Sequence, residues 1–444
     1  MSTLNLLDHC RQALDLVRKH GADEGEVFGQ ATRAITSTVE KNDLQISKSQ
    51  QETRIGVRAF VGTRVGFAST NDPTGLAAAV ADAVTLAKAS PGDPHNVLPE
   101  PTACEPVDGT YDPAAEAFTT EDAVHHAIRI LETAESVDPR IIVGDGNFSA
   151  EIRNRVLVNS SGAQATEPGS LFTCFVLTTA RDGDVVSNMA FKFGATRSVD
   201  AIDVETICRR SSVDALGSLG AEKGESFAGQ VLLDPDAVST LFAPLLFQLN
   251  ARNALRGMSR WKDALGESVA MPGFNLIDDG RLPGGVATAS FDREGIPHQR
   301  LHLIEQGVLR SFLHNAYTAH AFGVPNTGHA AGSAGSLPGI GPTNFMILPG
   351  DVAKEELISE MKRGLLVRRF SGNADPISGD FSGVAKAAYL IKNGKVDRAV
   401  SGTLIAGNVF EALKTMSGIS RETESVSNCT FPSLRLEGVS VTAE

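Results

Sequence analysis

The feature that most constrains the fold is a change of periodicity within the first ninety residues. Residues 4–20 repeat apolar side chains at steps of three and four, which predicts an amphipathic helix. Apolar residues then alternate from 26 to 70, with breaks at 41–43 and 62–63 that are typical of hairpin turns. Asp72-Pro73 opens a second helix. This part of the chain therefore predicts antiparallel strands between two helices.

The same order of elements follows a second time. Residues 91–118 contain six prolines and little periodicity, so they are the best candidate for a linker. A helix capped by Thr119, strand-like runs between 141 and 193, and a helix over about 200–216 come next. Residues 218–228 indicate a second junction. We expect three domains: an N-terminal α+β domain (1–100), a middle α+β domain (101–227) and a C-terminal β-rich domain (228–444).

The last part of the chain mixes hairpins with a few helices. Asp234-Pro235 predicts the start of one long helix that reaches about Leu255, and Asp351 predicts the cap of a helix that ends near Gly364. Asn393-Gly394 is the strongest two-residue hairpin signal in the sequence. The predicted class is α+β: N-terminal α/β domains with antiparallel sheets flanked by helices, and a C-terminal, mostly antiparallel β domain with a few helices.

Charge and hydropathy argue against two classes of partner. The formal net charge is −13, and a surface this acidic repels nucleic-acid phosphates. The densest basic runs lie among acidic residues and are interpreted as solvated faces: Arg209-Arg210, Lys362-Arg363 and Arg368-Arg369. No stretch reaches the ~18 apolar residues that a bilayer requires. We expect no nucleic-acid partner and no membrane partner.

Cysteine usage favours a reducing compartment. The chain has five cysteines, an odd number, with no Cys-x-x-Cys pair. The first twenty residues carry charges among their leucines, unlike a signal peptide. We therefore expect reduced thiols and a cytoplasmic protein.

Common catalytic motifs are missing from the sequence. It contains no phosphate-binding glycine loop of either common type, no Gly-x-Ser-x-Gly and no His-Glu-x-x-His. The spacing of His298 and His302 is suggestive, but their segment alternates. In a strand the two side chains would lie ~13 Å apart, too far to share a zinc ion. A polar strand face is the simpler interpretation.

Two other groups of residues stay open at this level. His314, His320 and His329 lie in a helix-and-loop stretch and could build a site with Cys429, although Cys429 is interpreted as a plain thiol. The paired acids of the turn Asp292–Gly295 could act in catalysis, but paired acids are also common in tight turns.

Several segments, taken together in order and spacing, resemble the TldD/PmbA family, also called modulators of DNA gyrase. The similarity covers nearly the whole chain. The segments of the second half are 290–297, 303–309, 326–330, 344 with 348–350, 378–382, 402–408 and 432–434; those of the first half are 45–47, 56–58 and 66–68.

The resemblance implies a function and a division of labour. The family pairs two related subunits into a cytosolic metalloprotease that degrades or matures unfolded peptides. Its TldD-like subunit carries His-Glu-x-x-x-His on a helix of the third domain, with a later cysteine as a further zinc ligand. The corresponding helix here is the one opened by Asp234-Pro235, and no histidine occurs between His126 and His298. The chain therefore resembles the PmbA/TldE subunit, which lacks the metal.

From this resemblance we expect no zinc, no cofactor and no catalytic residue in this chain, and zinc in a TldD-like partner. A homodimer stays open. The predicted peptide- or partner-binding residues are Asp292, Glu294, Gly295, Thr327, Gly328, Gly379, Asp380 and Phe381. Two alternatives remain: a free-standing peptidase with its site built from His314, His320, His329 or Cys429, and a non-enzymatic protein that binds DNA gyrase.

Overall fold

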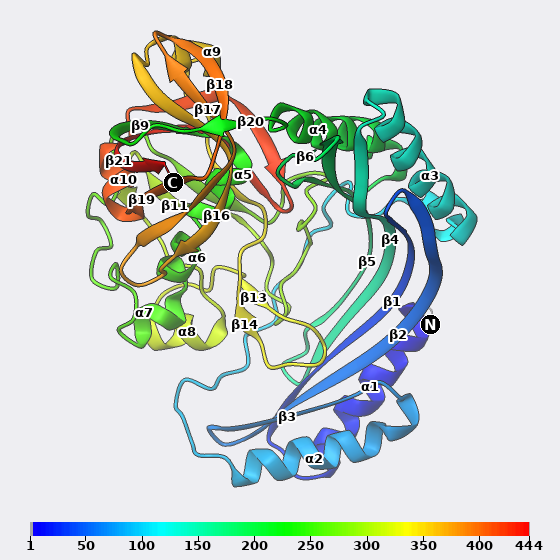
Figure 1. Ribbon diagram of the computed structural model, residues 1–444. Helices are drawn as coiled ribbons and strands as arrows, with labels where there is room; N and C mark the ends of the chain where they lie inside the picture. The colour runs from blue at the N-terminus through cyan, green and yellow to red at the C-terminus, as the bar shows by residue number, and fades with distance from the viewer. Residues whose placement is uncertain (1–2, 444) are drawn as a thin grey trace.

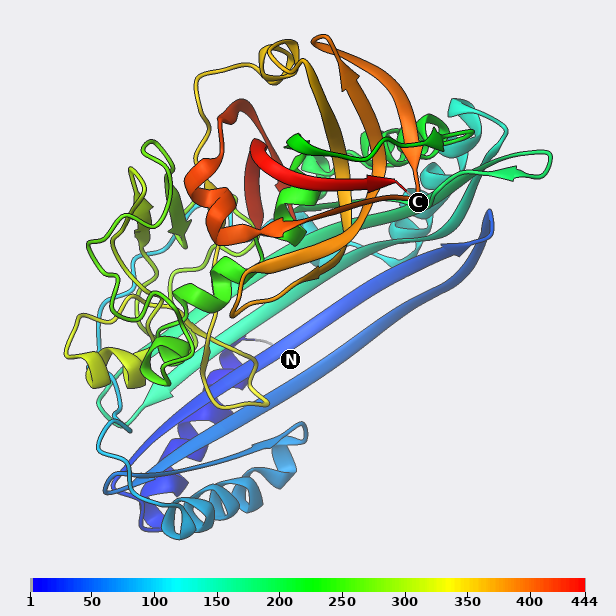
Figure 2. The ribbon, with the colours of Figure 1, turned by 60° about the vertical axis from the view of Figure 1, so that its left-hand side comes forward.

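The computed structural model describes residues 3–443. It consists of a long curved sheet with helices on one face and a C-terminal domain against the other face (Figures 1 and 2). None of the helices in that range is long and apolar enough to cross a membrane.

The first sheet is antiparallel and has the order β3-β2-β1-β4-β5-β6, with β7 also paired to β5. Because β1 pairs with β4 from Glu26 to Glu40, the sheet continues across the proline-rich segment. The turn between β1 and β2 has Lys41 and Asn42 at positive φ, as a two-residue hairpin requires. The strands are β1 (Glu24–Glu40), β2 (Asp43–Val61), β3 (Arg64–Thr70), β4 (Ile141–Asn159), β5 (Gln164–Asp182), β6 (Val185–Val186) and β7 (Ala190–Thr196).

Four helices cover one face of this sheet. On β1, Val27 and Ala31 pack beneath the first two helices and Ile35 packs beneath the other two. Alternate residues of a strand point to opposite faces, so the intervening residues of β1 face the C-terminal domain. The predicted positions of these helices are confirmed: α1 (Thr3–Lys19), α2 (Leu76–Ala89), α3 (Thr120–Val137) and α4 (Val204–Gly217). Short 3₁₀ turns are Pro73–Gly75, Pro113–Ala117 and Val199–Ala201.

The C-terminal domain is built on a second, mixed sheet with the order β12-β11-β10-β15-β21-β9-β16-β17-β18-β8, to which β19 and β20 add. Most pairs are antiparallel, and the predicted hairpin at Asn393-Gly394 joins β17 to β18. The strands are β8 (Glu222–Lys223), β9 (Phe227–Leu233), β10 (Leu276–Asp279), β11 (Arg300–Glu305), β12 (Val308–Leu309), β15 (Phe345–Ile347), β16 (Arg363–Ala374), β17 (Asp380–Lys392), β18 (Lys395–Ser401), β19 (Thr403–Asn408), β20 (Gly418–Val426) and β21 (Cys429–Ala443). A separate pair is β13 (Ala330–Ala331) with β14 (Gly339–Ile340).

The long helix expected after Asp234-Pro235 is wrong in its length. The structure has three short helices instead: α5 (Pro235–Leu241), α6 (Pro244–Leu249) and α7 (Ala251–Leu255). The first break falls at Pro244, which has no N–H to donate and whose ring clashes with the preceding turn. The helix expected from Asp351 is also shorter: α9 runs over Lys354–Ser359 and begins after Ala353. The other helices are α8 (Ala316–Phe322) and α10 (Val409–Thr415).

Candidate functional site

The acidic turn Asp292–Gly295 is the point where the C-terminal domain meets the first sheet. The Asp292 carboxylate accepts hydrogen bonds from the backbone N–H groups of Glu294 (2.8 Å) and Ile296 (3.0 Å), which closes the turn. Gly295 has φ +79°, and a Cβ there would lie 2.7 Å from a methyl group of Leu157 on β4. Glycine therefore provides both the left-handed backbone and the close approach to the sheet.

Two charged side chains of this turn, Arg293 and Glu294, form ion pairs with two charged side chains of the first sheet. Arg58 on β2 donates from Nη1 to Glu294 Oε1 and from Nη2 to Glu26 Oε2 on β1, each at 2.7 Å. Arg293 Nη1 donates to Glu26 Oε1 at 2.9 Å. All four side chains are buried. Two cations and two anions balance, as buried charges must.

Asp292 lies beside this cluster, and no cationic side chain among residues 3–443 forms an ion pair with it. Burial raises the pKa of Asp292 to about 7, and the nearby charge of Glu294 adds to the effect, while three backbone N–H donors oppose it. Asp292 therefore changes its protonation state near neutral pH.

The loop Thr327–Gly328 packs against the same turn. Ala330, just after it, donates its N–H to Asp292 Oδ2 at 2.9 Å. Gly328 has φ +69°, and a Cβ there would lie 2.4 Å from the carbonyl oxygen of Pro297. The structure thus brings together five predicted residues: Asp292, Glu294, Gly295, Thr327 and Gly328.

The other three predicted residues lie elsewhere. Asp380 accepts from Asn408 Nδ2 at 2.8 Å, and a Cβ on Gly379 would meet the ring of Phe410 at 2.3 Å. Phe381 is 3% exposed and belongs to the core of the C-terminal domain. Phe381 pairs with β16 and β19, so this trio lies within the second sheet and away from the acidic turn.

The members of the open histidine and cysteine group differ in their surroundings. His329 Nε2 lies 3.0 Å from Asp278 Oδ1 and its Nδ1 lies 2.9 Å from Thr327 Oγ1, so both ring nitrogens are occupied. His320 is exposed on α8 and contacts His95. Burial raises the pKa of Cys429 to about 11, with Asp278 as a smaller cause, so the thiol is protonated at neutral pH.

Burial also keeps the side chains of His314 and His298 neutral at neutral pH. It lowers the pKa of His314 to about 4 and that of His298 to about 3. The interpretation of His298 as part of a polar strand face is wrong, because His298 precedes β11 and is buried, with its ring centroid 6.4 Å from that of His329. His302 is exposed on β11. Between residues 3 and 443 no three His, Cys, Asp or Glu side chains lie where they could hold a metal ion together.

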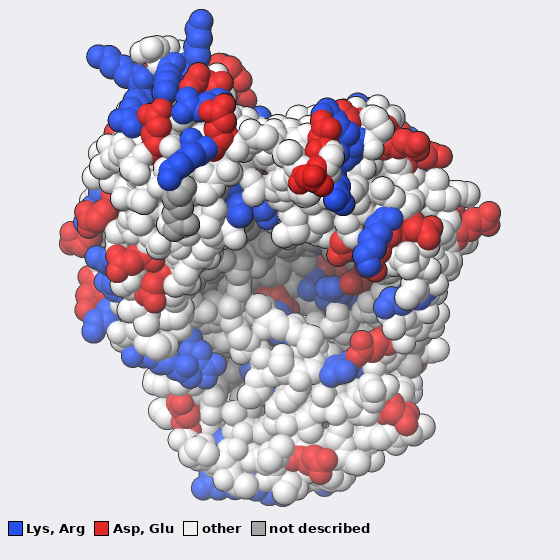
Figure 3. Space-filling model, in the orientation of Figure 1, with Lys and Arg blue, Asp and Glu red and all other residues white. Residues whose placement is uncertain are grey.

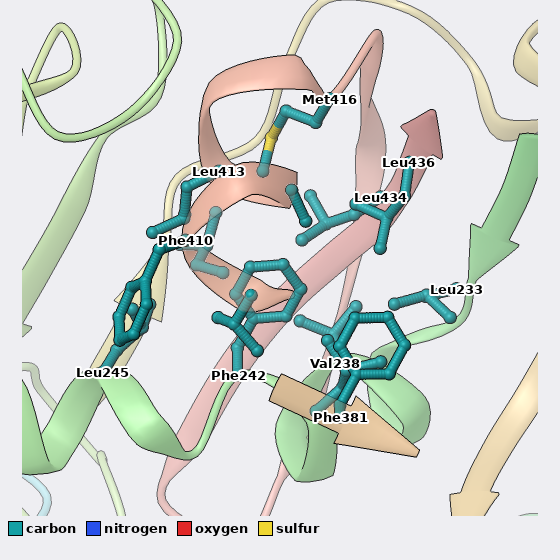
Figure 4. Close-up of a cluster of buried hydrophobic side chains, with 14 of the residues drawn as sticks. Leu233, Val238, Phe242, Leu245, Phe381, Phe410, Leu413, Met416, Leu434 and Leu436 are labelled. Atoms are coloured by element: carbon teal, nitrogen blue, oxygen red, sulfur yellow. The ribbon is translucent and has the colours of Figure 1, made fainter. Parts of the chain in front are cut away.

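The stretch that corresponds to the expected zinc helix does not fit a metal ion. Phe242, Pro244 and Leu245, where α5 gives way to α6, are all buried in the core. Figure 4 shows Phe242 and Leu245 among the side chains of α10 and β21. Phenyl, pyrrolidine and isobutyl groups offer no donor atom to zinc, so no chemical step is assigned to zinc in this chain.

Sequence reasoning missed a groove on the inner face of the first sheet. Two cavities of about 280 and 150 Å³ share the side chains of Arg153, Arg155 and Ala287. Arg197 lines the larger cavity and His298 the smaller one. We call these five residues the arginine groove. The alternation of Arg153 and Arg155 along β4 was a signal for one charged face, whereas Arg197 and His298 carried none.

Comparison with known proteins finds both sequences and a solved structure that resemble this chain. Models of three PmbA/TldA metallopeptidase domains match it in order: domain 1 over residues 25–87, the central domain over 113–219 and the C-terminal domain over 227–443. A metalloprotease of Methanothermobacter thermautotrophicus is 26% identical, over 89% of this chain and 87% of its own. Metalloprotease PmbA of Escherichia coli O157:H7 is 24% identical, over 95% and 93%. The fold is that of the crystal structure of TldE from Thermococcus kodakarensis, with a TM-score of 0.89 at 24% identity over 98% of this chain and 100% of that one.

Proposed function

Because the chain belongs to the PmbA/TldD metallopeptidase family, we propose that it is the non-catalytic, PmbA/TldE-like subunit of a two-subunit metalloprotease that acts on unfolded peptides. The partner is a TldD-like chain that carries His-Glu-x-x-x-His and holds the zinc. The observation that supports this proposal is the α5–α6 stretch, whose buried side chains are apolar where the family resemblance leads us to expect the zinc ligands of a catalytic subunit.

The shape of the molecule supports a role in guiding peptide. The C-terminal domain and the inner face of the first sheet enclose a hollow with basic and acidic side chains on its walls (Figure 3). In addition, β3 pairs with β2 only from Ile55 to Val61, so the half of β2 from Asp43 to Arg54 has β1 on one side and no strand of residues 3–443 on the other. Free sheet edges take up extended peptides by strand addition.

The free-standing peptidase has less support. A cysteine nucleophile requires a thiolate and a base with an available nitrogen. Cys429 is protonated at neutral pH, and both nitrogens of His329 are engaged.

The cytoplasm remains the proposed compartment, since all five cysteines are free thiols.

Elemental analysis of the full-length chain, purified alone, tests the proposal. We expect zinc well below one ion per chain, whereas a TldD-like chain purified in the same way carries stoichiometric zinc. One tightly held zinc ion per chain, accompanied by peptide cleavage that a chelator abolishes, would contradict the proposal.

A further inference from the structure

The arginine groove has a surplus of positive charge. Three arginines and two glutamates line its larger cavity. Arg153 pairs with Glu151, and Arg155 pairs with Glu167. Within residues 3–443, Arg197 has no carboxylate at ion-pair distance, so it is the unmatched cation.

Arg197 is held rigidly in this position. Its guanidinium donates to three backbone carbonyl oxygens: Nε to Gly285 at 3.1 Å, Nη1 to Ser170 at 3.0 Å and Nη2 to Thr288 at 2.8 Å. These bonds use three of the five N–H donors of a guanidinium. Burial lowers the pKa of Arg197 to about 10, and the neighbouring charge of Arg155 contributes. An anion that entered the cavity would offset the free-energy cost of burying the Arg197 charge.

The smaller cavity offers a second kind of contact. His298 is 7% exposed and lines this cavity, and its Nδ1 has no hydrogen-bond partner among the described residues. Burial keeps this ring neutral at neutral pH, so His298 adds no charge to the smaller cavity.

We propose that the arginine groove binds a carboxylate group of the peptide substrate, with the carboxylate against Arg197 and Arg153 in the larger cavity and the adjoining peptide backbone along the smaller one. Planar guanidinium groups recognise carboxylates by paired N–H···O bonds. The carboxylate belongs either to the C-terminus of the peptide or to an acidic side chain. This inference deepens the proposed function, because it assigns a substrate class to the subunit that lacks the zinc.

Isothermal titration calorimetry on the full-length chain tests the site with three acetylated, unstructured peptides of otherwise equal sequence. One peptide has a free C-terminal carboxylate, one is C-terminally amidated, and one is amidated but carries an internal glutamate. We expect at least one carboxylate-bearing peptide to bind about tenfold more tightly than the neutral amide. The peptide that gains affinity identifies the source of the carboxylate. Equal affinity of all three overturns the proposal.

Variants locate the binding. Arg153→Gln should weaken the preference for the carboxylate, since only Arg197 then remains to bind it, and Arg153→Lys should retain more of the preference. Arg129→Gln is the matched control, since Arg129 is also a partly exposed arginine in an ion pair, with Glu205, but lies on α3. A preference that is undiminished in Arg153→Gln, with unchanged thermal stability, places the site elsewhere and overturns the proposal. These measurements need no catalytic partner, so failure to activate a TldD-like chain would refute the proposed function and leave this site standing.

Discussion

Arg58 and Glu294 are joined by a 2.7 Å ion pair between Nη1 and Oε1, although 236 residues separate them in the sequence. Arg58 belongs to the first sheet and Glu294 to the acidic turn of the C-terminal domain. Both side chains are buried, at 8% and 1% exposure. The pair therefore fixes the two bodies that enclose the hollow.

Loss of the Glu294 charge should destabilise the protein. Glu294→Gln removes one of the two anions of Arg58, and we expect a loss of about 2–3 kcal/mol in the free energy of unfolding. Glu52→Gln is the control, since the exposed pair of Glu52 with Arg54 is worth at most about 1 kcal/mol. Urea denaturation measures the free energy of unfolding of both variants. An equal decrease in the two would show that the buried pair stabilises the protein no more than the exposed pair does.

The protonation of Asp292 should give stability a distinctive dependence on pH. Its pKa rises on folding from the ordinary 3.8 to about 7, so between these values the folded protein binds a proton that the unfolded chain has released. The stabilising contribution of Asp292 is thus full below pH 3.8, falls as the pH rises to about 7, and is constant above that.

Asp292→Asn, which cannot titrate, isolates this contribution. Denaturation between pH 4 and pH 8 should show the wild type losing stability relative to the variant as the pH rises. A stability difference that does not change over this range would show that Asp292 keeps an ordinary pKa.

Gly328 should tolerate substitution less well than another glycine of the same backbone conformation. Alanine costs about 1–2 kcal/mol in the left-handed region at either site. A Cβ added at Gly328 (φ +69°) would also clash with the Pro297 carbonyl oxygen, whereas a Cβ added at Gly323 (φ +65°) would enter open space. Thermal denaturation should therefore show a larger loss for Gly328→Ala than for Gly323→Ala. A larger loss for Gly323→Ala than for Gly328→Ala would mean that the backbone near Pro297 shifts without cost to accept the added methyl group.

Cys429 and His320 should be dispensable for catalysis. We expect Cys429→Ser and His320→Ala to leave the turnover of a complex with a TldD-like subunit within about twofold of the wild type. The buried Cys429 thiol is protonated at neutral pH, and His320 is exposed on α8. A peptidase assay on complexes of equal concentration measures this. A large fall in turnover with the complex intact would favour a site built from these residues.

Local signals in the sequence predicted the local structure. The hairpin at Asn393-Gly394 and the helices α1 to α4 follow from turn chemistry and periodicity, which act over a few residues. β4 appears in the sequence as two runs, 141–148 and 152–158, but is one strand. The small side chain of Ala150 gives little periodic signal, although it is buried in the core that α3 and α4 cover.

Long-range partners were beyond the reach of the sequence. The turn Asp292–Gly295 was recognisable from its composition, but its ion pairs depend on Glu26 and Arg58, more than two hundred residues away. Sequence reasoning also could not separate Phe381, a core residue, from surface positions nearby. Apolar residues at a strand start are compatible with either environment, and only the tertiary packing decides between them: the Phe381 ring packs against Phe370 of β16 in the core.

The most direct test of the central claim is the rate at which an unfolded peptide is cleaved by this chain alone, by a TldD-like chain that carries His-Glu-x-x-x-His, and by their equimolar mixture. The account predicts no cleavage by this chain alone and zinc-dependent cleavage by the mixture well above that of the partner alone. Zinc-dependent cleavage by this chain alone, unchanged when the partner is added, would contradict it.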